Sequence, residues 1–407
     1  MIRFQFNLIA VAFCLFAAIH VAYPVDANGQ SRKLILVVGA DGQEEYGKQF
    51  RDWASNWRKV VFEAAAKSIT NDSNAESDQD SQLKSNGKEK PQAGPDLSKP
   101  DSSRIELVEI GIAEPGEKSD LEQLEQAIVS TDSKTVEFWL ILIGHGTDDR
   151  KLSKFNLRGR DLTASQLNQW LANLKNRVVV VNCAAASAGF ISKLKAPNRV
   201  VITSTKSPSQ YNFSRFGKYL AESIADPTLD LDKDQQTSLL EAFIAASART
   251  QEFYTQETRL ATELAIIDDN GDGKGTPGDW FEGTRVGRQS KSGVPDGIQA
   301  NQIFLVRRGA EAKLTESERE TRDQLEAELE KWRAKKSRMD EATYYKSIEP
   351  ILIRLAKLYS EVEGRGSDPA EMNEPESEAI QKNQDGENQD NELTNSENQD
   401  SGREQPF

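Results

Sequence analysis

One histidine and one cysteine each follow a strongly apolar run in this sequence. The run FWLILIGHG (138–146) places His145 between two glycines, and the run RVVVVNC (177–183) ends in Cys183. An imidazole within reach of a thiol can take its proton, and the resulting thiolate is a strong nucleophile. If the two runs are neighbouring strands, we expect His145 to act as acid and base and Cys183 as nucleophile in one catalytic site. The alternative is that Cys183 is an ordinary buried residue and His145 a hydrogen-bonded loop residue.

Apolar runs rich in valine and isoleucine alternate with helical patterns along the chain. The runs predict strands over 33–40, 104–111, 137–144, 177–183, 199–205 and 301–308. Helical periodicity marks 53–69, 120–129, 163–174 and 215–225. This alternation predicts an α/β domain over 33–310 with a mainly parallel sheet flanked by helices. The carboxyl ends of neighbouring parallel strands lie about 5 Å apart, so the sheet would bring His145 and Cys183 together.

The first residues have the pattern of a secretory signal peptide. The apolar run 8–19 follows a basic residue, and a small-residue cleavage pattern ends at Ala27, which predicts that residues 1–27 are removed. Cleavage would also remove His20 and Cys14 and would leave a chain without a stable membrane span. The run is short for an uncleaved anchor, the alternative. We therefore expect a periplasmic or extracellular protein.

Charge and composition limit the partners of the chain. The 407 residues carry a net charge of −14, which disfavours nucleic acid and anionic membrane surfaces, since both repel an acidic protein. The hydrophobic content of 37% is enough for a buried core. Two polar segments, 70–103 and 365–407, are predicted to be a disordered insertion and a disordered acidic tail.

A helical hairpin, with the pattern of a short coiled coil, is predicted over 315–362. Thr315 and Glu318 have the spacing of a capping box at the start of its first helix. Apolar residues then recur at helical spacing in both halves of the segment. These residues are Leu325, Leu329 and Trp332, then Ile348, Leu352, Leu355 and Tyr359. The hairpin is expected to pack on the core or on a protein partner.

Over 33–310 the chain resembles the caspase-hemoglobinase fold of clan CD cysteine peptidases, and is most similar to bacterial legumain-like proteins. The segments that carry the resemblance are IGHGT (143–147), NLRGRDLTASQLNQWL (156–171), the strand ending at Cys183, and RVVITSTKSPSQYNFSRFGKYLAESI (199–224). The resemblance implies a His145 and Cys183 dyad that hydrolyses peptide bonds through an acyl-enzyme. It also implies that a backbone N–H at Gly146 stabilises the oxyanion, and that the chemistry needs no cofactor.

The register around Cys183 leaves two functions open. The family places an acidic or amide residue two positions before its nucleophile. If Asn182 takes the acidic position, the nucleophile position falls on Ala184 and the chain is an inactive homologue that binds peptides or proteins. If Cys183 is the nucleophile, the chain is a secreted cysteine endopeptidase. A slip of one residue decides where the thiol points, because side chains of a strand alternate between faces.

The segment STKSPSQYN (204–212) is expected to line the pocket for the residue before the scissile bond. It contains Lys206 but no carboxylate. This composition argues against a preference for arginine or lysine and leaves aspartate or asparagine open.

Two acidic loops have the spacing of calcium ligands. The first offers oxygen ligands at positions 1, 3, 5, 9 and 12 of an EF-hand loop. These residues are Asp230, Asp232, Asp234, Ser238 and Glu241. The second loop offers Asp268, Asn270, Asp272 and Asp279, with a glycine at position 6. The alternative is that both are solvated acidic turns. A calcium-dependent assembly protein that acts through its hairpin is therefore a third hypothesis.

Overall fold

The computed structural model describes residues 31–76, 105–287 and 294–364. The predicted signal peptide (1–27) and acidic tail (365–407) lie outside the described residues, as does most of the predicted insertion (70–103). No helix in the described part of the chain is both long and apolar enough to cross a membrane.

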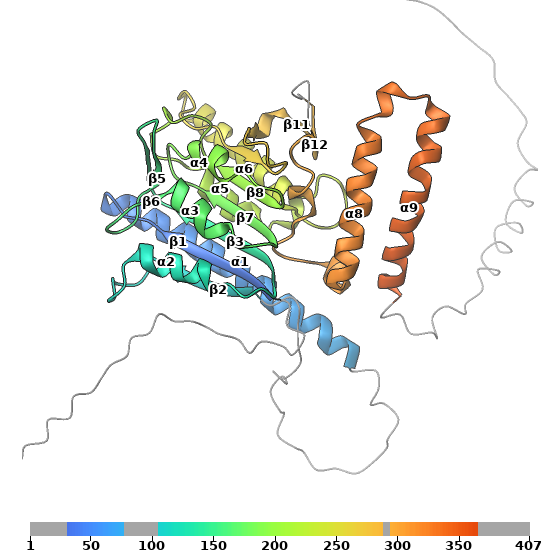
Figure 1. The fold of residues 1–407 in the computed structure, drawn as a ribbon, viewed down its shortest axis with the longest axis horizontal. Coiled ribbons are helices and arrows are strands. Elements are labelled where there is room, and N and C mark those ends of the chain that lie inside the picture. Colours follow the sequence, from blue (N-terminus) through green and yellow to red (C-terminus); the bar gives the residue numbers. More distant parts are fainter. Residues whose placement is uncertain (1–30, 77–104, 288–293, 365–407) are drawn as a thin grey trace, which may run out of the picture. The chain divides into compact units, whose positions relative to one another are not determined.

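A sheet of seven strands forms the centre of the fold (Figure 1). Its strand order is β10-β9-β8-β7-β3-β1-β2. The strands β1, β2, β3, β7 and β8 pair in parallel, whereas β9 and β10 are antiparallel additions at one edge. Their bounds are Ser31–Val38 (β1), Ile105–Ile110 (β2), Thr135–Ile143 (β3), Arg177–Asn182 (β7), Arg199–Thr203 (β8), Ile266–Asp268 (β9) and Thr276–Pro277 (β10). The predicted mainly parallel α/β fold is confirmed.

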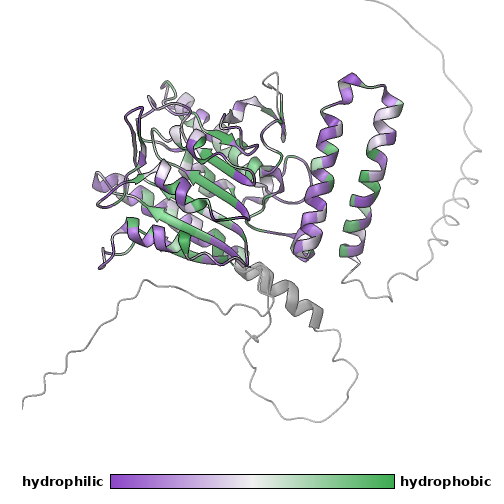
Figure 2. Ribbon diagram, in the orientation of Figure 1, coloured by the Kyte–Doolittle hydropathy of each residue, from purple (hydrophilic) through white to green (hydrophobic). Residues whose placement is uncertain are grey.

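Helices cover both faces of this sheet, which explains why its strands are continuous apolar runs rather than alternating ones (Figure 2). One face packs against α1 (Glu44–Glu76), α5 (Phe216–Ser223) and α6 (Leu239–Gln256). The other packs against α2 (Asp120–Val129), α3 (Ala164–Leu171) and α4 (Gly189–Leu194). We call these the α1 face and the α2 face.

Two smaller sheets accompany the central one. Strands β4 (Gly146–Asp148), β5 (Ser153–Phe155) and β6 (Leu162–Thr163) form an antiparallel sheet directly after β3. Strands β11 (Phe281–Glu282) and β12 (Arg285–Val286) form a two-stranded ribbon. The first of these sheets matters for the site, because Gly146 begins it.

The prediction of a sixth strand over 301–308 is wrong. Residues Ile303 to Val306 are buried as expected, but the carbonyls of the first three accept hydrogen bonds outside any strand ladder. The Ile303 carbonyl accepts the N–H of Leu239, and the carbonyls of Phe304 and Leu305 accept from the guanidinium of Arg32. The sixth position in the sheet belongs to β9. In addition, α1 extends to Glu76, into the segment predicted to be an insertion.

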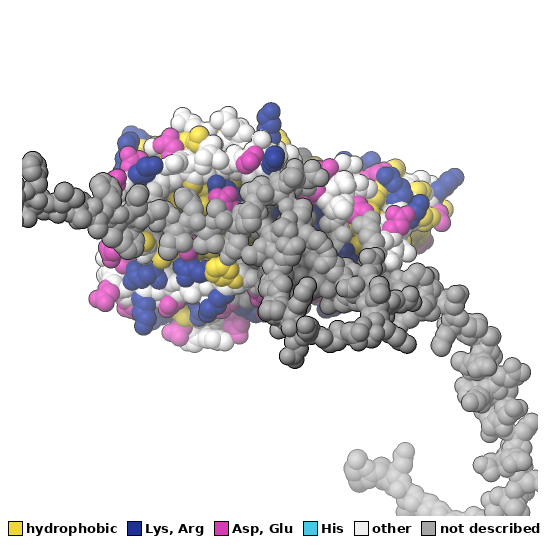
Figure 3. All heavy atoms as spheres, turned by 90° about the horizontal axis from the view of Figure 1, so that it is seen from below, with side chains coloured by type: hydrophobic (Ala, Val, Ile, Leu, Met, Phe, Trp, Pro, Cys, Tyr) yellow, Lys and Arg dark blue, Asp and Glu magenta, His cyan; other side chains and the backbone are white. Residues whose placement is uncertain are grey.

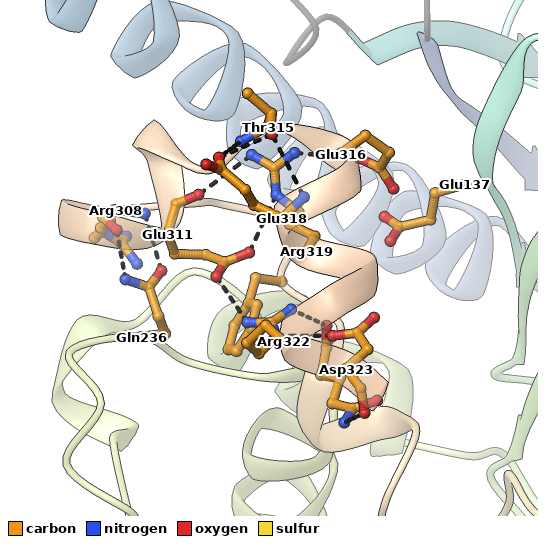
Figure 4. A network of polar contacts seen from close by, with 12 residues as sticks. Glu137, Gln236, Arg308, Glu311, Thr315, Glu316, Glu318, Arg319, Arg322 and Asp323 are labelled. Carbon is orange, nitrogen blue, oxygen red and sulfur yellow. Dashed lines mark hydrogen bonds and ion pairs between the residues drawn. The ribbon is translucent and has the colours of Figure 1, made fainter. Parts of the chain in front are cut away.

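The predicted hairpin is present as α8 (Glu316–Arg333) and α9 (Glu341–Glu363), and the short helix α7 (Gly309–Lys313) precedes it. A network of ion pairs joins α7 to α8 (Figure 4). The buried carboxylate of Glu311 receives the guanidinium groups of Arg319 at 3.2 Å and Arg322 at 2.7 Å. Asp323 of α8 then pairs with Arg177, the first residue of β7. The hairpin is thus fastened at the amino ends of the strands.

Basic and acidic side chains are interspersed on the face of the molecule seen in Figure 3. The absence of a nucleic-acid partner stays a prediction.

We predict that Glu311→Gln lowers the free energy of unfolding by about 3–5 kcal/mol, because it leaves two buried guanidinium groups without their shared carboxylate. Urea unfolding measures the change. Glu361→Gln is the control, since the Lys357–Glu361 pair is largely exposed and should contribute less than about 1 kcal/mol. Equal effects of the two substitutions would contradict a structural role for the buried network.

Candidate functional site

The carboxyl ends of β1, β3, β7 and β8 lie along one edge of the sheet, which we call the carboxyl edge. The register pairs Val38 with Ile143, Leu142 with Asn182, and Asn182 with Thr203. The residues that follow these strands therefore meet at this edge. His145 follows β3 and Cys183 follows β7, so the structure brings the two loops to the same edge.

His145 is half-buried within a group of aromatic rings. Its imidazole meets the rings of Tyr46 and Phe50 edge-on, with centroids 5.3 and 5.0 Å away, and it lies 6.3 Å from Phe213. Tyr46 and Phe50 belong to α1, whereas Phe213 comes from the loop after β8. The histidine ring therefore lies on the α1 face of the carboxyl edge.

The polar contact of His145 is with the loop after β1. Its Nε2 lies 3.2 Å from the carbonyl oxygen of Asp41. Because a carbonyl only accepts, Nε2 carries the proton in this contact, and Nδ1 is the basic nitrogen of the neutral ring. Gly42 lets this loop approach: its φ is +66°, and a Cβ there would lie 3.1 Å from Nε2. Among the described residues, no hydrogen bond joins His145 to Cys183.

Cys183 belongs to the hydrophobic core and is 1% exposed. It continues the alternation of Val179 and Val181 on the α1 face. A Cβ added to Gly217 would lie 3.0 Å from the Cys183 sulfur and 3.3 Å from the Trp53 ring, so the thiol packs between α1 and α5.

Burial controls the ionisation of this thiol. Desolvation, followed by the negative charge of Glu263, raises the pKa of Cys183 to about 12. With that pKa, only about one thiol in 100,000 is ionised at neutral pH. The thiolate needed for nucleophilic chemistry is therefore almost absent.

Ala184 lies beside Gly146, the residue that follows His145. A Cβ added to Gly146 would lie 3.2 Å from the Ala184 methyl group. The side chain of Asn182 fixes this arrangement, because its Oδ1 accepts the N–H of Ala184 at 3.0 Å. Ala184 belongs to the cluster on the α2 face, whereas the His145 ring and Cys183 lie on the α1 face. The role of Gly146 as an oxyanion donor stays a prediction.

No family model and no curated protein matches the chain. Two caspases are among the similar solved structures. The Drosophila initiator caspase Dronc is 11% identical to this chain, with a TM-score of 0.35. The match covers 64% of this chain and 87% of the Dronc chain. Caspase-1 from Spodoptera frugiperda is 9% identical with a TM-score of 0.30, over 60% of this chain and 88% of its own. The fold class rests on the sheet described above, and the legumain-like relationship stays a prediction.

A group of buried hydroxyls at the carboxyl edge was missed in the sequence. Ser187 lies 3.3 Å from the Ser204 hydroxyl and 3.1 Å from that of Thr205, and Ser204 donates to the Ala184 carbonyl at 2.5 Å. These contacts tie the loop after β7 to the end of β8. Single serines and threonines after strands are too common to have signalled the group.

Glu263 was also missed, although it lies close to the thiol. Its buried carboxylate accepts from the Ser214 hydroxyl, from the N–H groups of Arg215 and Phe216, and from the Tyr254 hydroxyl. It thus holds the start of α5, whose residue Gly217 borders Cys183. Nothing in the local sequence marks this glutamate.

The first acidic loop brings three of its five predicted ligands together. Asp230, Asp232 and Asp234 each offer a carboxylate oxygen within 4.8 Å of the others. Burial and the charge of Asp232 raise the pKa of Asp234 to about 7. Ser238 and Glu241 instead form the capping box of α6, although Glu241 also accepts the N–H of Leu231 in the loop.

The second acidic loop does not gather its predicted ligands in the same way. The carboxylates of Asp268, Asp272 and Asp279 do not form a group within 4.8 Å in the described part of the chain. Asp268 accepts the N–H groups of Gly271 and Gly273, and Asn270 donates to the Val294 carbonyl. The carboxylate of Asp268 therefore binds backbone N–H groups of its own loop.

Two buried carboxylates that the sequence did not single out support this second loop. Asp269 accepts from the N–H groups of Gly297 and Ala300, and Asp296 accepts from Asp269 N–H and the Thr276 hydroxyl. Burial raises the pKa of Asp269 to about 6 and that of Asp296 to about 7. Both act as structural links between the loop and residues 294–300.

We predict that Cys183 reacts with iodoacetamide at least about 100-fold more slowly than free cysteine at about pH 9, where an ordinary thiol is largely ionised. Mass spectrometry of quenched samples measures the rate. The same thiol should label at the ordinary rate in concentrated guanidinium chloride, and His145→Ala should leave the native rate unchanged. Fast labelling that depends on His145 would instead support the dyad.

We predict that calcium raises the melting temperature if the first loop binds it, because a ligand of the native state stabilises that state by mass action. Asp232→Asn should reduce the shift, whereas Asp272→Asn in the second loop should not. The shift should be larger above pH 7 than below it, since calcium must displace the proton that the raised pKa of Asp234 retains. A melting curve that does not respond to millimolar calcium would identify a plain acidic turn.

Proposed function

We propose that this chain is a non-catalytic α/β protein that binds a peptide or protein segment at the carboxyl edge of its sheet. The observation that supports this proposal most strongly is the burial of the Cys183 thiol, which is 1% exposed in the core of the α1 face. This is the inactive alternative of the two functions that the sequence left open.

The cysteine endopeptidase is the less favoured alternative. Acyl transfer requires a thiolate that reaches both the substrate carbonyl and the histidine. Cys183 is 1% exposed and its pKa is raised to about 12. For the thiol to ionise and to reach a substrate, the packing of Trp53 and Gly217 around it would have to open. Such an opening would expose the aromatic core of the α1 face. The cost of that exposure argues for binding without hydrolysis.

The carboxyl edge has side chains that suit a binding surface. Tyr211 in the loop after β8 is 75% exposed, and Phe213 stacks on Tyr46 with centroids 4.5 Å apart. The guanidinium of Arg215 lies 5.4 Å from the Phe213 centroid. Aromatic rings with polar tips provide large contact areas at low entropic cost and are enriched at interfaces. A ligand with an apolar or aromatic anchor fits this surface.

The setting of this activity follows from the N-terminal sequence. A signal peptide over 1–27 would deliver the chain to the periplasm or the cell exterior, where its ligand would be a secreted peptide or an exposed protein segment. Calcium at the first acidic loop would stabilise the fold there, without a part in recognition.

Selection from a random peptide display library tests the proposal. We expect selected peptides to bind the chain and to remain intact on prolonged incubation, as followed by mass spectrometry. Tyr211→Ala should weaken binding at least about tenfold, because it removes an exposed ring from the surface. Leu260→Ala is the matched control, since Leu260 is 91% exposed in the loop after α6.

A second substitution separates the two functions. Cys183→Ala should leave peptide affinity unchanged, with a melting curve to confirm folding. Cleavage of a selected peptide that is lost in Cys183→Ala would establish the endopeptidase and reject the proposal. Binding that does not respond to Tyr211→Ala would place recognition on another surface.

A further inference from the structure

Helix α9 has one apolar face that is already occupied. Its residues Tyr344, Ile348 and Ile351 are buried against Leu325 and Leu329 of α8. Trp332 and Leu355 complete this cluster, which contains residues of α8 and α9 only. The hairpin is therefore held together by a small core of its own.

A second apolar stripe on α9 is exposed in the described part of the chain. Tyr345, Leu352 and Ile353 are 50%, 43% and 60% exposed. Their spacing of seven and eight residues places them on one side of the helix, and the exposed Ala356 continues the same stripe. Figure 2 shows hydrophobic residues recurring along α9. Three large exposed apolar side chains in line are typical of an interaction surface rather than of scattered surface residues.

The two polar segments outside the described residues, 77–104 and the sequence after α9, have too few apolar residues to cover this stripe. The sequence after α9 includes NQDGENQDNELTNSENQDSG (383–402), which has one large apolar residue, and 77–104 is similarly polar. Neither segment can supply the apolar surface that would replace water on the stripe. Once the predicted signal peptide over 1–27 is removed, the stripe is left for another polypeptide.

Two residues of opposite charge, Glu349 and Lys357, lie on the same side of α9 as the stripe, and Lys357 also pairs with Glu361 of its own helix at 3.7 Å. Glu349 lies four residues before Ile353, and Lys357 lies four residues after it. In an antiparallel helix pair with its two-fold axis at Ile353, each Glu349 faces Lys357 of the second copy. Ile353 then packs against its own symmetry mate, with Leu352 beside it. We infer that the α9 stripe joins two copies of this chain in a symmetric dimer through a bundle of two hairpins.

This dimer leaves the carboxyl edge free. The pair Arg177–Asp323 fastens α8 at the amino end of β7, whereas His145 and Tyr211 belong to the opposite ends of the strands. A dimer through α9 would therefore carry two accessible carboxyl edges. Insofar as the proposed peptide binding holds, the dimer is bivalent and gains avidity for ligands that present two segments.

Light scattering and sedimentation of the chain from residue 28 to 407 test the dimer without any ligand. We expect a concentration-dependent dimer. Ile353→Glu should raise its dissociation constant at least about 100-fold, because two copies of a buried apolar side chain are replaced by charge. Leu260→Glu is the matched control, as it makes the same kind of change at an exposed apolar residue elsewhere and should have no effect.

A charge exchange identifies the second copy as the partner. Glu349→Lys and Lys357→Glu should each weaken the dimer, and the double variant should return the dissociation constant to within about threefold of the original, since the facing charges are again opposite. Unchanged melting curves would confirm that the variants fold. A chain that stays monomeric at all concentrations, or a dimer that is insensitive to Ile353→Glu, would overturn the inference. Either result would leave the peptide-binding proposal standing, because that proposal is measured on the monomer surface.

Discussion

Burial of the parallel sheet on both faces is the constraint on which the rest of the structure depends. It requires apolar residues on both sides of each strand, and the pleat then assigns alternate residues to opposite layers. In β7, Val179 and Val181 point to the α1 face, and Cys183 continues that series directly after the strand. The thiol is therefore placed by the same rule that places the valines. Ala184 falls on the other series, next to Gly146.

The fold could be predicted from the sequence because its strands are fully buried. Five of the six predicted strands are present, since runs such as RVVVVN have no polar alternation that could suggest a solvated surface. The failure at 301–308 has the same origin. That run is equally apolar and equally buried, and composition alone does not distinguish a strand from a buried loop whose carbonyls are satisfied by Arg32. Strand β9 was missed because three residues are too few for a pattern.

The sequence predicted where in the sheet the candidate site lies, but not how its side chains point. Two apolar runs ending in His145 and Cys183 identify one edge of the sheet, and the structure brings both residues there. The direction of the thiol depends on a single step of register, which composition cannot determine. The acidic loop shows a related ambiguity. Ser238 and Glu241 fit positions 9 and 12 of a calcium loop, but the same spacing is a capping box, and in the structure they cap α6.

The surroundings of Cys183 give this cysteine a structural role. A buried free cysteine behaves as a small hydrophobic residue, and its size is set by its neighbours. Because the sulfur lies 3.0 Å from the place of a Gly217 Cβ, α5 can approach β7 only with a glycine at that position. Glu263 anchors the first turn of α5 through backbone N–H groups, so the same carboxylate that raises the thiol pKa also keeps Gly217 against it. The packing of Cys183, Gly217 and Trp53 is thus a structural unit that holds α1 and α5 over the sheet. The binding surface that we propose, formed by Tyr46, Phe213 and Tyr211, lies on elements that this unit positions.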